Sequence, residues 1–196
     1  ANIFWSSIPC IVITASLHDC PLIVYMGQEF GEKANEIEGY NEADDRSSMF
    51  DFWRVETHQR WMNGGKFDGG ALNADEKLID TFYQDLFKRV VQSDAIAYGA
   101  FFDLQYAQSD SYPSKKVYSF LRYTKNERLL IICNFDSKQD YSFDVTIPDL
   151  AKDMMHLDKI KLQMQHAYLP PFHSAKATVS GNTIAIPANS AIIIKL

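Results

Sequence analysis

The strongest constraint on the fold of this 196-residue chain is an alternation of apolar and polar residues that begins near residue 98. Successive side chains of a strand point to opposite faces, so a period of two is typical of strands with one buried face. Lys125-Asn126-Glu127 and Ser180-Gly181-Asn182 have the composition of hairpin turns. The pattern predicts an all-β antiparallel sandwich over residues 98–196. Its strands are expected at 117–124, 128–135, 141–147, 177–180, 183–186 and 191–196, with a short helix at 149–156.

Residues 1–97 show a different pattern. The apolar run up to residue 18 predicts a buried helix, and the continuous apolar run 22–25 predicts a strand buried on both faces of a parallel sheet. After a long polar and aromatic stretch, Asn73 and Glu76 form a capping-box signature ahead of a helix over 74–92. Helix, strand, loop and helix make one and a half α/β units, which cannot close a sheet alone. The predicted domain boundary lies near residue 97.

Composition excludes several classes of protein. With 46% hydrophobic residues the chain has enough apolar material for a packed core, which excludes disorder. The net charge is −6 and the Lys and Arg residues are scattered, so no nucleic-acid partner is expected. The apolar stretch 3–17 is too short and too polar to span a bilayer, so no membrane partner is expected.

Metal-binding and redox patterns are weak in this sequence. The cysteines form no C-x-x-C pair, and free thiols are typical of a reducing compartment, which favours the cytoplasm. His18 lies two residues before a cysteine, but two ligands do not make a zinc site. The acidic residues within 44–51 lack the spacing of a calcium-binding loop. The sequence therefore predicts no metal and no cofactor. The cysteines are Cys10, Cys20 and Cys133.

Residues 21–31 read P-L-I-V-Y-M-G-Q-E-F-G, which resembles the eighth barrel strand and following loop of glycoside hydrolase family 13, the α-amylase family. Members of that family often read there as a variant of P-L-I-Y-x-G-Q-E-x-G. Residues 44–49, D-D-R-S-S-M, with Trp53 are similar to the downstream D-x-x-x-R-x-P-M-x-W segment of many members. The match departs where Ser48 replaces the usual proline and where extra residues precede the tryptophan.

The rest of the chain continues the resemblance in the family's order. The helix expected at 74–92 resembles the eighth barrel helix, residues 117–135 resemble the first hairpin of the C-terminal β-sandwich, and residues 184–194 resemble its last two strands. The resemblance implies an α/β remnant over residues 1–97, the end of a (β/α)₈ TIM barrel, followed by the C-terminal sandwich over 98–196.

The resemblance also implies a function for the parent protein. Family members cleave α-glucosidic bonds with retention of configuration, through carboxylates that follow the fourth, fifth and seventh barrel strands. This chain contains neither N-H-D nor R-x-D, so it lacks those groups, and retaining hydrolysis needs two carboxyl groups about 5–5.5 Å apart. We therefore expect a C-terminal fragment with no catalytic residue, inactive alone. Two alternatives stay open: a stand-alone carbohydrate-binding module and a purely structural sandwich.

Five residues are candidates for binding an α-glucan or maltooligosaccharide. Gln28 and Glu29 follow the expected parallel strand, where barrel sites are built, although Glu29 could instead pair with an arginine or a backbone amide and hold the loop. Tyr40 and Trp53 are aromatic rings that could stack on sugar faces or pack in the core. Arg46 could pair with Asp45 and pin the loop, or remain solvated.

The apolar surface of residues 1–31 would be unstable in water, because each buried aliphatic side chain is worth roughly 1.5–3 kcal/mol. Without the other barrel strands this surface needs another cover. We expect self-association through residues 1–31, or packing of the first helix against the helix at 74–92.

Overall fold

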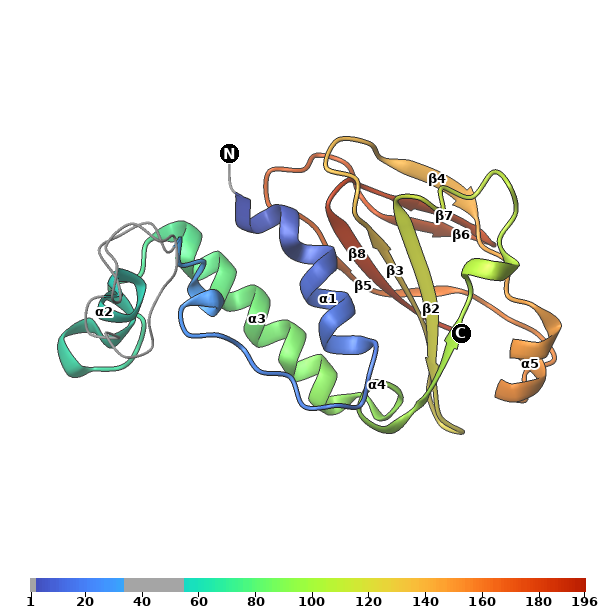
Figure 1. Cartoon of the computed structure of the whole chain (residues 1–196), viewed down its shortest axis with the longest axis horizontal. Helices are drawn as coiled ribbons and strands as arrows, with labels where there is room; N and C mark the ends of the chain where they lie inside the picture. Colours follow the sequence, from blue (N-terminus) through green and yellow to red (C-terminus); the bar gives the residue numbers. More distant parts are fainter. Residues whose placement is uncertain (1–2, 34–54) are drawn as a thin grey trace. The chain divides into compact units, whose positions relative to one another are not determined.

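A computed structural model describes residues 3–33 and 55–196 of the chain. The chain divides into two compact units, one formed by Ala1–Cys20 with Lys88–Leu196 and the other by Pro21–Phe87. Figure 1 labels most of the helices and strands. In the described residues, every helix is too short or too polar to cross a membrane.

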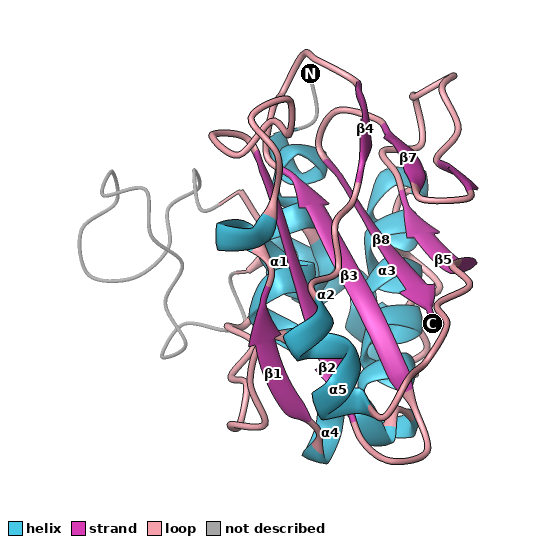
Figure 2. Ribbon diagram, turned by 90° about the vertical axis from the view of Figure 1, so that its right-hand side faces the viewer, coloured by secondary structure: helices cyan, strands magenta, loops and turns pink. Residues whose placement is uncertain are grey.

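Two antiparallel sheets form most of the larger unit (Figure 2). The first sheet has five strands in the order β1-β2-β3-β8-β5, and the second has three in the order β4-β7-β6. The strands of the first sheet are β1 (Ala100–Asp103), β2 (Val117–Tyr123), β3 (Arg128–Asn134), β8 (Ser190–Lys195) and β5 (Gln163–Tyr168). Those of the second are β4 (Tyr141–Asp144), β7 (Thr183–Ile186) and β6 (Thr178–Ser180).

The core lies between the sheets and is built from alternate residues of their strands. Leu130 and Ile132 of β3 pack in one cluster with Ile192 and Ile194 of β8 and with Ile184 of β7. These alternate residues face the second sheet, as in two sheets that pack face to face. The predicted all-β antiparallel architecture is confirmed.

Most predicted strands agree with the structure to within one residue, but two strands were missed and one is shorter than expected. β1 has only four residues, and β5 has a register shift between Met164 and His166 that breaks its alternation. β4 ends at Asp144, although Val145 and Ile147 still reach the core. The predicted helical segment is α5 (Asp149–Met155).

The predicted first helix is a 3₁₀ turn, Ile3–Ser7, that continues into α1 (Ile8–Ser16). Its residues Ile8, Val12 and Ala15 are buried, and α1 contacts β3 and β8 (Figure 1). The helix α1 therefore packs on the face of the five-stranded sheet that is opposite the sandwich core. The short helix α4 (Asp94–Tyr98) contacts the neighbouring strand β2.

The helix α3 (Ala74–Gln92) begins and ends where the sequence predicts. The backbone N–H of Glu76 donates to Asn73 Oδ1 at 3.0 Å, and the backbone N–H of Asn73 donates to the Glu76 carboxylate at 2.9 Å. The first backbone N–H groups of a helix have no acceptor within the helix. These two reciprocal bonds supply acceptors for two such N–H groups, which is the arrangement of a capping box.

Residues 22–25 do not form the predicted buried strand. They have no ladder partner among the described residues, and the side chain of Ile23 is 88% exposed. A parallel strand exists only through hydrogen bonds to its neighbours, and the described part of the chain supplies none for this segment. The smaller unit instead contains the 3₁₀ turn Gln28–Phe30, helix α2 (Glu56–Met62) and most of α3.

Candidate substrate-contact site

Two of the five predicted site residues lie in the described part of the chain. Gln28 and Glu29 are adjacent in the 3₁₀ turn Gln28–Phe30 of the smaller unit. Tyr40, Arg46 and Trp53 lie outside the described residues, as do the acidic residues within 44–51. The described part of the candidate site therefore consists of Gln28, Glu29 and their neighbours.

The glycines of the G-Q-E-F-G segment create the tight turn. Gly27 has φ +90°, and a Cβ atom there would lie 2.7 Å from the Cβ of Glu32. The backbone N–H groups of Phe30 and Glu32 both donate to the carbonyl oxygen of Gly27, at 3.0 and 2.9 Å. Only glycine adopts this backbone readily in such a close approach, so the sequence motif specifies where Gln28 and Glu29 point.

Gln28 is held by protein groups at both ends of its amide. Its Nε2 donates to Tyr83 Oη of α3 at 2.8 Å, and its Oε1 accepts the backbone N–H of Tyr25 at 3.3 Å. Burial raises the pKa of Tyr83 to about 12. The hydrogen bond from Gln28 lowers this pKa, and the nearby Glu29 carboxylate raises it. Gln28 thus fixes the turn to α3.

Glu29 lies beside a residue that the sequence analysis missed. Its Oε1 is 3.9 Å from His58 Nε2 of α2. The other carboxylate oxygen, Oε2, and His58 Nδ1 are both buried without a hydrogen-bond partner in the described part of the chain. Most buried polar atoms of folded proteins have a partner, so this pair is the best candidate for contact with a polar ligand. An isolated histidine about thirty residues downstream carries no sequence signal that could have revealed it.

Further contacts hold His58 in place. The Phe30 ring meets the His58 ring edge-on with centroids 5.7 Å apart, and it stacks on Trp61 at 6.0 Å. The Glu32 carboxylate accepts a hydrogen bond from the Thr57 hydroxyl at 2.6 Å and another from the Thr57 backbone N–H at 3.3 Å. These contacts join the turn to α2.

An ion-pair network joins α2 to the start of α3. Arg60 donates from Nε and Nη2 to the Glu76 carboxylate at 2.7–3.0 Å, and from Nη1 to Glu56 at 2.9 Å. The bonds to Glu76 and then to Glu56 raise the pKa of Arg60 above its usual value. In the described residues, no three His, Cys, Asp or Glu side chains are grouped to hold a metal ion.

Comparison with known proteins gives one family match and many structural matches. Residues 109–196 match the family described as alpha amylase, C-terminal all-beta domain. No curated protein matches the chain.

Among solved structures, the chain is similar to a debranching enzyme of Nostoc punctiforme, soaked with acarbose, at 16% identity and a TM-score of 0.53. It is also similar to AmyP in complex with maltose, at 12% identity and a TM-score of 0.61. A third similar structure is Eubacterium rectale Amy13B, at 15% identity and a TM-score of 0.59. These likenesses cover 97–98% of this chain but only 29–34% of the other chains, so this chain spans about a third of their length.

At these identities the solved structures show a shared fold, while the family match is a similarity in sequence over residues 109–196. That match covers seven of the eight strands found in the described residues, from β2 to β8, in both sheets. Residues 109–196 match the α-amylase C-terminal all-beta domain, which confirms the resemblance of this part of the chain to the C-terminal region of the α-amylase family.

Proposed function

We propose that this chain is the C-terminal part of an α-amylase-type glycoside hydrolase that cleaves α-glucans with retention of configuration. The observation that carries the proposal is the match of residues 109–196 to the α-amylase C-terminal domain. AmyP, one of the structural relatives, has been solved with maltose and, as a variant, with maltotriose. Maltooligosaccharides are accordingly the substrates that we propose for the parent of this chain.

In this proposal, residues 1–97 contribute the end of the catalytic barrel and residues 98–196 the sandwich. The structural likeness supports this division because it extends over almost the whole chain, well beyond the family match. Residues 21–25 would then complete a parallel sheet only where the neighbouring barrel strands are present.

We assign the chemical step to carboxylates that this chain does not supply. Retaining hydrolysis uses one carboxylate to attack the anomeric carbon and a carboxylic acid to protonate the departing oxygen, and water then releases the sugar. Among the described residues, the titratable side chain beside the Glu29 carboxylate is His58, at 3.9 Å, and not a second carboxylate. No residue of this chain is assigned a catalytic role.

Gln28 and Glu29 act instead at the floor of the substrate pocket in this proposal. The unpartnered Glu29 Oε2 and His58 Nδ1 support it, because sugar hydroxyls both donate and accept hydrogen bonds. Tyr40 and Trp53 would stack on the substrate rings, and Arg46 would hold the loop that carries them.

The test is to compare the chain of residues 1–196 with a protein extended through the residues encoded ahead of Ala1. We expect the extended protein to release reducing sugar from maltooligosaccharides, with the α-anomer appearing first in proton NMR spectra. We expect none from residues 1–196 alone. A β-anomer, or an inactive extended protein, would overturn the proposed reaction, and sugar release by residues 1–196 would overturn the assignment of the carboxylates.

A further inference from the structure

The larger unit contains a cavity of about 250 Å³ that does not involve Gln28 or Glu29. Three parts of the chain meet around it: the end of α3 with the start of α4, the turn between β2 and β3, and the strands β5 and β8. It is smaller than the roughly 300–1,000 Å³ of pockets that enclose drug-sized ligands. Its size therefore suits one sugar ring rather than a longer segment.

A β-bulge places an amide at this cavity. In the pairing of β5 with β8, Met164 opposes Ile194 and His166 opposes Ile193, so Gln165 between them has no partner on β8. The exposed side chain of Gln165 lines the cavity. Bulges often redirect a side chain next to a functional site, and this one interrupts the alternation of an edge strand at the cavity rim.

A fixed carboxylate lies at the same cavity. Glu127 accepts hydrogen bonds from Ser93 Oγ at 2.7 Å and from the backbone N–H of Ala95 at 2.8 Å. Both bonds end on Oε2, and an ionised carboxylate can accept several more on its two oxygens. Gln92, the last residue of α3, adds a second exposed amide.

The remaining wall of the cavity is apolar. Ile96, Leu129 and Ile193 contribute it, and each is at most 3% exposed. The ring of His166 also lines the cavity and packs edge-on against Tyr168 with centroids 4.4 Å apart. A sugar ring has a C–H face that suits an apolar wall and a rim of hydroxyls that suits amides and carboxylates.

The charges at the cavity argue against an ionic ligand. Arg89 and Glu127 contribute one charge of each sign, so neither a phosphate nor a metal cation would find a matching set of groups. Two amides, which both donate and accept, are well suited to a neutral polyol.

We propose that this cavity is a second α-glucan contact that holds one glucosyl unit of a maltooligosaccharide without cleaving it. The choice of an α-glucan as ligand rests on the function proposed above. The cavity belongs to the unit that contains the sandwich, so the contact serves to retain substrate on the protein.

The experiment titrates ¹⁵N-labelled residues 1–196 with maltotriose and follows the backbone amides. We expect saturable shifts at Glu127, Gln165 and His166 with a Kd of about 1 mM, an ordinary affinity for about a dozen ligand atoms. Gln165→Ala should weaken binding about fivefold, the worth of roughly one hydrogen bond, and Gln92→Ala should act in the same direction. Gln163→Ala is the matched control, because Gln163 is exposed on the same strand, pairs with Lys195 and does not line the cavity.

Two results would overturn the proposal. One is the absence of shifts at the cavity up to about 50 mM maltotriose, well above an expected millimolar Kd. The other is binding that Gln165→Ala and Gln92→Ala both leave unchanged. Neither result bears on the hydrolysis assay of the extended protein, so a failure here is distinct from a failure of the proposed function.

Discussion

Arg122 of β2 donates a hydrogen bond from Nη1 to the carbonyl oxygen of Leu17, the residue that ends α1, at 3.0 Å. The same guanidinium donates from Nε to the carbonyl of Ala95 at 3.1 Å and from Nη2 to that of Ile96 at 2.7 Å. Arg122 is only 2% exposed, and this burial lowers its pKa, an effect that Asp19 opposes. Cations are favourable at the carbonyl-rich ends of helices, so one side chain joins two helices to the sheet.

Replacing this guanidinium should cost stability. Arg122→Met keeps the aliphatic part of the side chain but removes three hydrogen bonds to carbonyl groups, of which that of Ala95 still accepts the backbone N–H of Gly99. We expect a loss of about 2–4 kcal/mol in the free energy of unfolding, measured by urea denaturation of residues 1–196. Arg128→Met is the control, because Arg128 is partly exposed and its Nε bonds a single carbonyl, that of Met155, at 2.9 Å. Equal losses in the two variants would contradict the special role of Arg122.

The sandwich could be predicted because each of its strands and turns is specified by residues that are adjacent in the sequence. β2 and β3 are seven residues long, rich in apolar and aromatic residues that favour strands, and joined by a short turn, so strand composition and turn chemistry agree. β5 was missed because its bulge at Gln165 breaks the period and polar residues occupy most of its length.

The other half of the chain shows where local sequence is insufficient. The run 22–25 has the composition of a buried strand, yet a strand needs partners that the described residues do not provide. Gln28 and Glu29 could be predicted from a motif with two glycines. His58 could not, because its proximity to Glu29 arises only from the packing of α2.

Asp136 should make stability depend on pH in acid. Its carboxylate accepts the backbone N–H groups of Lys138 and Gln139 at 2.9 and 3.1 Å, which lower its pKa below the ordinary value of 3.8. A lowered pKa in the folded state means that the stabilisation is complete above the ordinary pKa and disappears as pH falls through the lower folded value.

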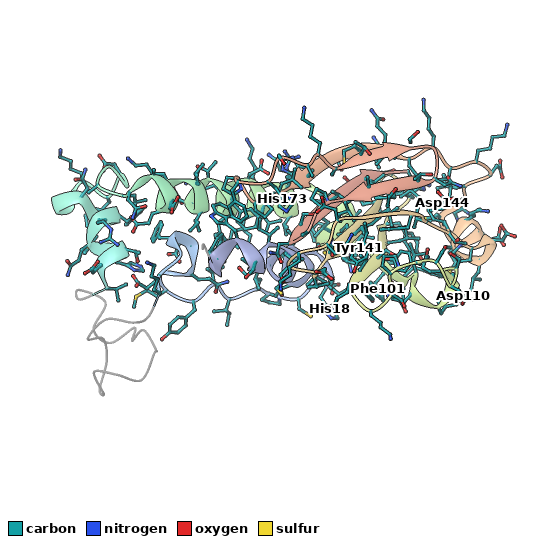
Figure 3. The ribbon with its side chains drawn as sticks, turned by 90° about the horizontal axis from the view of Figure 1, so that it is seen from above. His18, Phe101, Asp110, Tyr141, Asp144 and His173 are labelled. Atoms are coloured by element: carbon teal, nitrogen blue, oxygen red, sulfur yellow. The ribbon has the colours of Figure 1, made fainter. Side chains whose placement is uncertain are left out.

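The check compares urea midpoints at several pH values between about 2 and 7, a range that brackets the usual titration of a carboxyl group. Asp136→Asn should unfold at lower urea at neutral pH and lose less of its midpoint on acidification than the unchanged chain. Asp110→Asn is the control, because Asp110 is exposed on a connecting segment (Figure 3). Identical acid dependence in the unchanged chain and in Asp136→Asn would contradict the assignment.

Glu29 should contribute to binding and not to chemistry. In the extended protein, Glu29→Gln replaces a charged acceptor by a neutral one and should raise KM for maltotriose about tenfold with little change in kcat. A catalytic carboxylate would behave differently, since its loss lowers kcat by orders of magnitude. Glu56→Gln is the control in α2, where Glu56 bonds Arg60 and not His58. A collapse of kcat in Glu29→Gln would show that Glu29 takes part in the reaction.

Residues 1–31 should drive self-association of the chain when the rest of a barrel is absent. α1 is covered by β3 and β8, so the exposed apolar side chains of this segment lie in the run 22–25, where Ile23 is 88% and Leu22 40% exposed. An extended segment that belongs to no sheet of the described residues and exposes apolar side chains is a ready template for strand pairing with another copy. Sedimentation at micromolar concentration should therefore detect an oligomer. Ile23→Asp should dissolve it and leave the sandwich folded by circular dichroism, whereas Lys33→Asp, which adds a carboxylate outside residues 1–31, should not. An oligomer that persists unchanged in Ile23→Asp would mean that another surface mediates association.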